Sequence, residues 1–242
     1  MSGTRRFASL ALAGLLVSGA EAQDFGAERA RMVAEIEATY AEARYLTGLA
    51  AMAPRVRTTM AKVERHRLVG SALQAHAYRN HPLPIGHGQT ISQPFIVALS
   101  TELIAPAPYQ TVLEIGTGSG YQAAVLAEVV RQVYSIELLA PLAREAAARL
   151  KEMGYANVEV RVGDGYQGWP ERAPFDAIVV TAAAPFVPPA LVDQLKPGGR
   201  MVIPIGASGD VQRLLLVTKA ADGSIGQREV LPVRFVPLVP GR

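Results

Sequence analysis

Residues 112–122 read VLEIGTGSGYQ, an apolar run followed at once by three glycines at alternate positions. Glycine-rich turns after a buried strand let bare backbone approach a ligand and aim the N–H groups of the next helix at it. Dinucleotide-binding loops usually space their glycines as G-x-G-x-x-G, whereas Gly116, Gly118 and Gly120 are spaced as G-x-G-x-G. Glu114 stands just upstream, where a carboxylate repels a pyrophosphate and favours a ligand that carries positive charge.

From residue 111 onward, short apolar runs alternate with amphipathic stretches. This pattern predicts a mostly parallel sheet covered by helices on both faces, with ligands bound at the carboxyl ends of its strands. The predicted strands span 111–115, 132–136, 158–162, 177–180 and 201–205, followed by antiparallel strands at 214–218 and 230–235. The predicted helices span 121–130, 140–153 and 189–195, with a turn at 196–199.

Two further acids follow the next strands of this pattern. Glu137 lies about 20 residues beyond the glycine loop, where an acid can accept hydrogen bonds from both ribose hydroxyls. Asp164, beside Gly165, follows the third strand, where its carboxylate and a backbone N–H can reach adenine. Together with Glu114 these features predict an adenosine site with a cationic tail, as S-adenosylmethionine requires. The alternative is a glycine loop that binds no ligand.

The pattern of the first hundred residues predicts helices and contains no motif typical of a ligand-binding or catalytic site. Asp24 can cap a helix over 27–46 with Met32, Ile36, Tyr40 and Ala43 on one face. A second helix is predicted over 56–65 and a third over 93–103, separated by a proline- and glycine-rich loop that includes HPLPIGHGQT at 81–90.

Composition narrows the class of protein. The 242 residues, 50% hydrophobic and 19% charged, are typical of one folded domain. The net charge of +3 is scattered among acids rather than gathered in a basic stripe, so we expect no nucleic-acid partner. The chain has no cysteine, and its four histidines match no zinc spacing, so we expect no metal site.

The N-terminus has the pattern of a secretory signal. Arg5 and Arg6 precede an apolar stretch over 7–17, and Ala20-Glu21-Ala22 has the small-x-small pattern of a cleavage site. The apolar stretch is too short for a stable membrane anchor. We therefore expect a signal peptide at 1–22, cleavage before Gln23 and export to the periplasm, without membrane insertion afterwards. A cytoplasmic protein with a frayed apolar N-terminal extension is the alternative.

Several stretches together resemble one enzyme family over residues 77–242. They are GHGQTISQPFIVAL, the glycine loop, VYSIE, GDGYQGWPERAPFDAIVVTAA, QLKPGGRMVIPIG and RFVPL. The chain resembles protein-L-isoaspartate (D-aspartate) O-methyltransferases, in which TISQP, VTAA and RFVPL occur in this order. The resemblance implies a doubly wound, mostly parallel seven-stranded sheet of the Rossmann-like methyltransferase class. It places a methyltransferase domain at 76–242, after an N-terminal helical extension at 23–75.

The resemblance also implies roles for individual residues. Ser92 is implied as the active-site serine. The residues implied or expected to hold S-adenosylmethionine are Glu114, Gly116, Thr117, Gly118, Gly120, Glu137, Asp164 and Gly165. Those expected to shape the acceptor pocket are Thr90, Gln93, Thr181 and Ala182. Glu64 and Asn80 depart from the family pattern, which has a proline and, frequently, an acid at these positions.

The implied reaction is methylation of the α-carboxylate of isoaspartyl residues in damaged proteins, by a monomer. This acceptor is ionised at neutral pH, with a pKa of about 3.5, so no general base is needed. Orientation and desolvation then carry the rate. Ser92 is expected to donate a hydrogen bond to that carboxylate beside a helix N-terminus, although it could instead cap the helix. Methylation of another carboxylate or small molecule, and a non-catalytic adenosyl-binding module, are the alternative functions.

Overall fold

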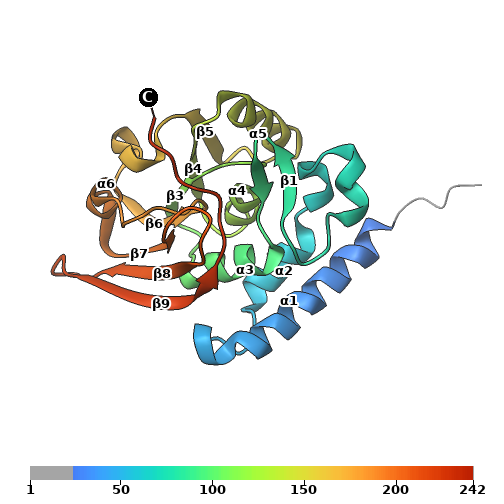
Figure 1. Cartoon of the computed structure of the whole chain (residues 1–242), viewed down its shortest axis with the longest axis horizontal. Coiled ribbons are helices and arrows are strands. Elements are labelled where there is room, and N and C mark those ends of the chain that lie inside the picture. Colours follow the sequence, from blue (N-terminus) through green and yellow to red (C-terminus); the bar gives the residue numbers. More distant parts are fainter. Residues whose placement is uncertain (1–23, 242) are drawn as a thin grey trace, which may run out of the picture.

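The computed structural model describes residues 24–241, so the expected signal peptide at 1–22 lies outside the described residues. A seven-stranded sheet with the order β5-β4-β3-β6-β7-β8-β9 crosses the middle of the molecule (Figure 1). The first five strands in this order are parallel, whereas β8 pairs antiparallel with both β7 and β9. The strands are β3 (Thr111–Ile115), β4 (Gln132–Glu137), β5 (Val158–Val162), β6 (Phe175–Val180), β7 (Leu195–Ile205), β8 (Gln212–Lys219) and β9 (Ile225–Val233).

Helices cover both faces of this sheet, as the strand–helix alternation predicts. The α-helices are α1 (Phe25–Thr47), α2 (Pro54–Lys62), α3 (Pro94–Leu103), α4 (Tyr121–Ala127), α5 (Ala140–Glu152) and α6 (Pro189–Asp193). Four 3₁₀ turns accompany them: η1 (Arg65–Leu68), η2 (Ser71–His76), η3 (Gly165–Gln167) and η4 (Pro170–Arg172). Within residues 24–241, none of these helices has the length and hydropathy needed to cross a bilayer.

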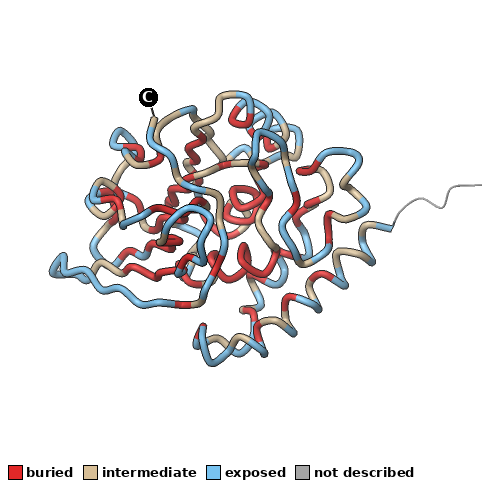
Figure 2. The backbone as a smooth tube through the Cα atoms, viewed as in Figure 1, coloured by how far each residue is buried: buried red, intermediate tan, exposed pale blue. Residues whose placement is uncertain are grey.

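Alternation along the strands divides the core into two layers. On β3, Val112 belongs to the cluster that packs against α1–α4, and Leu113 belongs to the cluster against α6 and the η3–η4 segment. Successive side chains of a strand point to opposite faces, so a parallel strand that is apolar throughout is covered on both sides. Figure 2 shows this buried interior running through the centre of the sheet. The predicted doubly wound fold is therefore confirmed.

Helix α1 lies along one side of the molecule (Figure 1) and begins at Phe25, two residues before the predicted start, with Asp24 as the predicted cap. The Asp24 side chain accepts hydrogen bonds from the Gly26 and Ala27 N–H groups at 3.0 and 3.1 Å, satisfying two donors that a helix start leaves free. Met32, Ile36 and Tyr40 are fully buried. These residues share one core cluster with α3 and α4, so α1 is packed onto the same body as the sheet.

Three local predictions are wrong. The stretch 81–90, predicted as a loop, contains a hairpin of β1 (Leu83–Gly86) and β2 (Gln89–Ile91), closed by positive φ angles at Gly86, His87 and Gly88. The predicted turn at 196–199 lies inside β7, which begins at Leu195 with an irregular register against β6. Strand β9 starts and ends earlier than predicted. In each case strand pairing overrides the local turn signals of proline and glycine. This pairing is within the hairpin for β1 and β2, and with neighbouring strands of the sheet for β7 and β9.

Candidate functional site

The glycine loop between β3 and α4 is held against two neighbouring strands. The Gly116 N–H donates to the Ile136 carbonyl of β4 at 2.8 Å. On the other side, the Thr181 hydroxyl at the end of β6 donates to the Gly116 carbonyl at 2.6 Å. Gly116 has φ +93°, and a Cβ there would lie 2.5 Å from Thr181 Oγ1. The backbone at this position therefore leaves no room for a side chain, and its loop faces the carboxyl edge of the parallel strands.

Glu137 joins the end of β4 to the same loop. The Gly118 N–H donates to Glu137 Oε2 at 2.8 Å, and the Leu139 N–H donates to Oε1 at 3.0 Å. Each carboxylate oxygen retains acceptor capacity beyond these bonds. The side chain lies in the wall of a cavity next to Gly116 and Gly118. A fixed carboxylate in this position can accept the hydroxyls of a ribose.

Glu114 lies beneath the glycine loop and does not line the cavity beside Glu137, whereas its place just upstream of the loop indicated an acid beside the ligand. Its side chain is fully buried, and Ser135 donates a hydrogen bond to its Oε2. Its Oε1 has no hydrogen-bond partner among residues 24–241. Burial raises the pKa of Glu114 to about 8; the Ser135 hydrogen bond opposes this rise and the charge of Glu137 adds to it. An unsatisfied buried carboxyl oxygen fits a ligand that brings a cation to it.

The raised pKa of Glu114 predicts a pH-dependent stability for the ligand-free protein. Above pH 4.5 the unfolded state releases the Glu114 proton, whereas the folded state keeps it. The contribution of Glu114 to the free energy of unfolding is therefore complete below pH 4.5. It is lost as pH rises toward about 8. Urea unfolding between pH 5 and 8.5 should show this decline for the wild type and a flatter profile for Glu114→Gln. Glu42→Gln, at an exposed glutamate of α1, should keep the wild-type profile; an unchanged slope in Glu114→Gln would contradict the prediction.

Asp164 and Gly165 follow β5 and lie under the C-terminal segment, residues 236–241. The Asp164 carboxylate accepts the Tyr166 N–H at 2.8 Å and does not line the cavity beside Glu137, whereas Gly165 does. The Leu238 N–H donates to the Ala183 carbonyl at 2.7 Å. A Cβ on Gly165 would lie 3.0 Å from the Leu238 side chain. The C-terminal segment therefore forms a cover over the expected adenine end of the site.

Four of the eight expected cofactor residues line one cavity, and Glu114, Thr117, Gly120 and Asp164 do not. Gly116, Gly118, Glu137 and Gly165 line one cavity, with Leu138 and Leu139 between them and the C-terminal segment above. Thr117 is buried beside Ser135 and lines only a small neighbouring cavity that Glu114 also lines. Asp164 does not line the first cavity. Gly120 opens α4, and a Cβ on it would meet Leu150 of α5 at 3.1 Å, so its position reflects helix packing.

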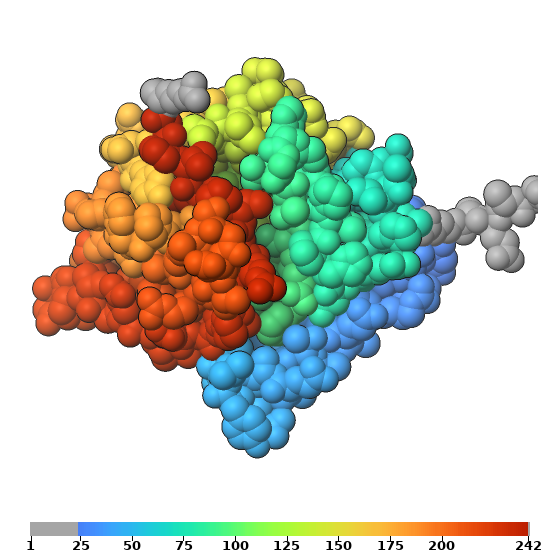
Figure 3. Space-filling model, in the orientation of Figure 1, coloured from blue at the N-terminus to red at the C-terminus, as the bar shows by residue number. Residues whose placement is uncertain are grey.

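A second, larger cavity of about 670 Å³ adjoins the first. Ser92 and Gln93 line it, and Thr90, Thr181 and Val236 line both cavities. Ala182 lines only the first. Figure 3 shows the surface hollowed between the C-terminal segment and the green β1–β2 region. Thr90 and Thr181 thus mark the junction at which a cofactor and an acceptor can meet.

Ser92 does not cap α3, although the sequence allowed that role. The Phe95 N–H in the first turn donates instead to Asn80 Oδ1 at 2.9 Å, and Pro94 has no N–H to offer. The half-buried Ser92 hydroxyl makes no hydrogen bond with any other described residue and faces both the acceptor cavity and the small cavity near Glu114. The helix start has fewer free N–H donors than expected, and the serine hydroxyl is available to a ligand.

Sequence reasoning missed several residues of the site. Leu138, Leu139 and Val239 line the first cavity, and Thr39 and Ala43 line the second. Asn80 was noted only as a departure from a pattern, yet it links α1 to α3, because its Nδ2 donates to Thr39 Oγ1 at 3.2 Å. The proximity of α1 to the site has no signal in the local sequence. The RFVPL stretch signalled the C-terminal cover.

Comparisons with known proteins agree with this geometry. The model of the family described as Protein-L-isoaspartate(D-aspartate) O-methyltransferase matches residues 46–242. The protein-L-isoaspartate O-methyltransferase 2 of Syntrophobacter fumaroxidans is 58% identical over 223 residues, covering 92% of this chain and 90% of that protein. The family model begins at the end of α1 and includes all seven strands of the sheet.

Solved structures agree as well. One protein-L-isoaspartate O-methyltransferase is 28% identical with a TM-score of 0.76, over 86% of this chain and 65% of that chain. A Plasmodium falciparum chain, solved in complex with S-adenosyl-L-homocysteine, is 26% identical with a TM-score of 0.68, over 85% of this chain and 97% of that chain.

Proposed function

Because the chain belongs to the protein-L-isoaspartate(D-aspartate) O-methyltransferase family, we propose that Ser92 holds the acceptor carboxylate at the junction of the two cavities. The chain is an enzyme that uses S-adenosylmethionine to methylate the α-carboxylate of L-isoaspartyl, and D-aspartyl, residues in damaged proteins, which initiates their repair. The observation that supports the role of Ser92 is its hydroxyl, which faces the acceptor cavity without a partner among the described residues.

The cofactor supplies an electrophilic methyl group when bound. The residues that would hold it are the backbone of Gly116 and Gly118, the carboxylate of Glu137 for a ribose and Gly165 for the base. Glu114 would neutralise a cationic group through its unpaired Oε1. Thr117 and Gly120 would act indirectly, by holding the loop and the start of α4. These residues fit S-adenosylmethionine because the bare backbone of the loop, the fixed carboxylate of Glu137 and the unsatisfied buried oxygen of Glu114 lie at one edge of the sheet.

The protein's own contribution to the rate is positioning. The acceptor carboxylate needs no base because it is ionised at neutral pH. Ser92 can donate one hydrogen bond to a carboxylate oxygen and so fix the direction of the other. Thr90, Gln93 and Thr181 surround this point, and Phe235 and Val236 bring apolar surface that excludes water from it. Orientation and desolvation therefore both come from residues lining the larger cavity.

The proposal is tested with labelled S-adenosylmethionine and two peptides that differ only in an isoaspartyl or a normal aspartyl residue. Label should pass to the isoaspartyl peptide alone. Its damaged residue has a free α-carboxylate, whereas the α-carboxyl group of a normal aspartyl residue is part of the peptide bond. Label in both peptides, or only in an unrelated carboxylate, would contradict the acceptor assignment. Binding of S-adenosylhomocysteine without any transfer would contradict a catalytic role for this site.

Export of the protein remains a proposal that rests on the sequence of residues 1–22. The basic start, apolar stretch and Ala20-Glu21-Ala22 pattern support it. Mass spectrometry of the N-terminus from an expressing cell should find Gln23 first, whereas an intact Met1 in a cytoplasmic fraction would reject export. The monomeric state and the lack of a nucleic-acid partner likewise stay predictions, which sedimentation and a binding assay can test.

A further inference from the structure

The acceptor cavity is larger than a carboxylate group requires. Its volume is about 670 Å³, and it extends from Ser92 past α3 to α1 and to the end of β9. An isoaspartyl residue placed at Ser92 would fill only the part next to Thr90 and Thr181. The remaining volume is continuous with this point and is therefore open to a neighbouring part of the acceptor peptide.

The remaining part of the cavity is mostly apolar. Its walls include Val211, Leu231, Val233 and Phe235 from the C-terminal strands and the loops beside them. Val211 is 55% exposed, and a large aliphatic side chain exposed at the mouth of a continuous apolar cavity indicates a site for a partner. Arg234 is the one charged residue among the described residues that line the cavity, and no carboxylate lines it.

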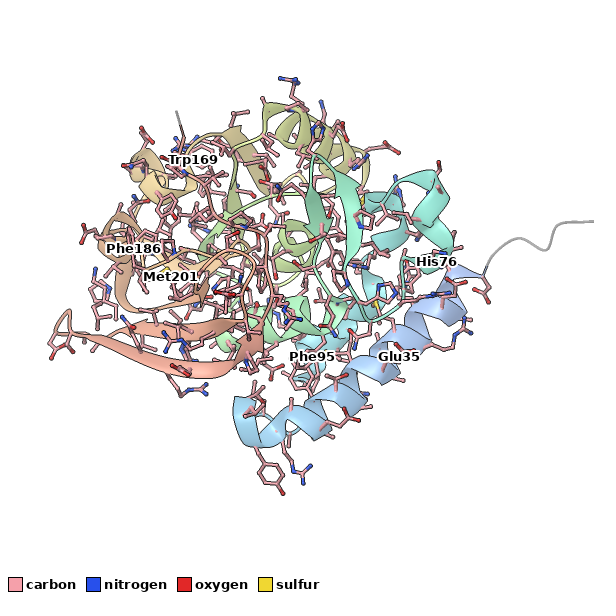
Figure 4. The ribbon with its side chains drawn as sticks, in the orientation of Figure 1. Glu35, His76, Phe95, Trp169, Phe186 and Met201 are labelled. Atoms are coloured by element: carbon pink, nitrogen blue, oxygen red, sulfur yellow. The ribbon has the colours of Figure 1, made fainter. Side chains whose placement is uncertain are left out.

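Helix α1 supplies the remaining wall through Thr39 and Ala43, which lie one turn apart on the same face. This wall is fixed in place. Tyr40 packs edge-on against Phe95 of α3 with ring centroids 5.4 Å apart. Phe95 is labelled close to α1 in Figure 4. Asn80 Nδ2 donates to Thr39, and Asn80 Oδ1 accepts the Phe95 N–H. The width of the cavity at this point therefore depends on the small size of Ala43.

We propose that this part of the cavity is a subsite for a large apolar side chain next to the isoaspartyl residue, bounded by Ala43, Val211 and Phe235. The inference rests on the proposed acceptor site at Ser92, because it is the continuity with that site that identifies the occupant. The enzyme then discriminates among damaged proteins by the residue beside the damage. A leucine neighbour is favoured over glycine by about tenfold in kcat/KM, which is the usual effect of filling an apolar pocket.

The test compares isoaspartyl peptides that carry leucine or glycine immediately before or after the damaged residue. Wild type should prefer leucine at one of these positions, and Ala43→Phe, which fills the subsite, should bring the leucine-to-glycine ratio close to one. Ala38→Phe, an equal change at an exposed α1 residue away from the cavity, should keep the wild-type ratio. Thermal unfolding and S-adenosylhomocysteine affinity are measured for both variants to exclude misfolding.

A second variant should raise the activity toward one peptide rather than only lower it. Val211→Glu places an anion at the exposed mouth of the subsite, so it should lower kcat/KM for the leucine peptide and raise it for a lysine peptide. Equal kcat/KM for the leucine and glycine peptides in wild type, at both positions, would overturn the subsite while leaving methyl transfer intact. A wild type that methylates none of the isoaspartyl peptides would overturn the proposed function itself, and the subsite with it.

Discussion

Replacement of Ser92 with alanine should lower kcat for isoaspartyl peptides by about 100-fold, because loss of one orienting contact displaces the acceptor from its in-line position. The Ser92 hydroxyl faces the acceptor cavity and takes no part in capping α3, where the Phe95 N–H bonds to Asn80. Ser92 does not line the cavity beside Glu137, and its side chain makes no capping hydrogen bond at the start of α3. The affinity for S-adenosylhomocysteine, measured by calorimetry, should therefore remain that of the wild type.

Ser92→Thr is the matched control, because it keeps the hydroxyl and adds one methyl group. It should retain much more activity than Ser92→Ala, with some increase in KM where the added methyl group takes up space. A Ser92→Ala enzyme with full kcat would remove this residue from the catalytic machinery. A parallel loss of cofactor affinity would show that the residue acts through folding instead.

Replacement of Gly116 with alanine should reduce the affinity for S-adenosylhomocysteine by about 100-fold or more, equivalent to about 2.7 kcal/mol. The backbone at Gly116 has φ +93°, which strains any other residue by about 1–3 kcal/mol. The new methyl group would also lie 2.5 Å from Thr181 Oγ1, whose hydroxyl is held by the carbonyls of Ile115, at the end of β3, and of Gly116. Relief of this clash must move the loop or the end of β6, and both line the cofactor cavity.

Gly154→Ala separates the two parts of this effect. Gly154 follows α5 with φ +87°, and a Cβ there would meet nothing within 4 Å. This variant should lose about 1 kcal/mol of stability from backbone strain alone and bind S-adenosylhomocysteine as the wild type does. If Gly116→Ala behaves like Gly154→Ala in both thermal unfolding and calorimetry, close packing of the loop does not determine cofactor binding.

The sheet could be predicted because its strands are short, apolar and regularly spaced. The bounds predicted for β3 and β5 agree with the structure, and β4 is longer by one residue. Buried parallel strands carry a strong local signal, since both of their faces are covered. The hairpin of β1 and β2 carries the opposite signal, because Pro84 and the glycines resemble a loop until Leu83 and Ile91 are known to pair.

The candidate site could be predicted only where it follows the strand ends. Gly116, Gly118, Glu137 and Gly165 meet in one cavity because the carboxyl ends of parallel strands share one edge of the sheet. The sequence indicated the charge of Glu114 but not its burial. Its position just before the loop indicated a charge facing the ligand, whereas its complete burial under the loop raises its pKa to about 8.

The order of residues along this chain determines the alternation of strands and helices, the glycine loop and the family resemblance, because these depend on local composition and spacing. Tertiary structure alone decided that Asn80 would cap α3, that the Ser92 hydroxyl would be left available and that Ala43 of α1 would form a wall of the acceptor cavity. These features arise from contacts between segments that are not adjacent in the sequence, with 15 residues between Asn80 and Phe95 and a far longer stretch between Ala43 and the C-terminal strands. Local spacing carries no information about which distant surfaces the folded core will bring together.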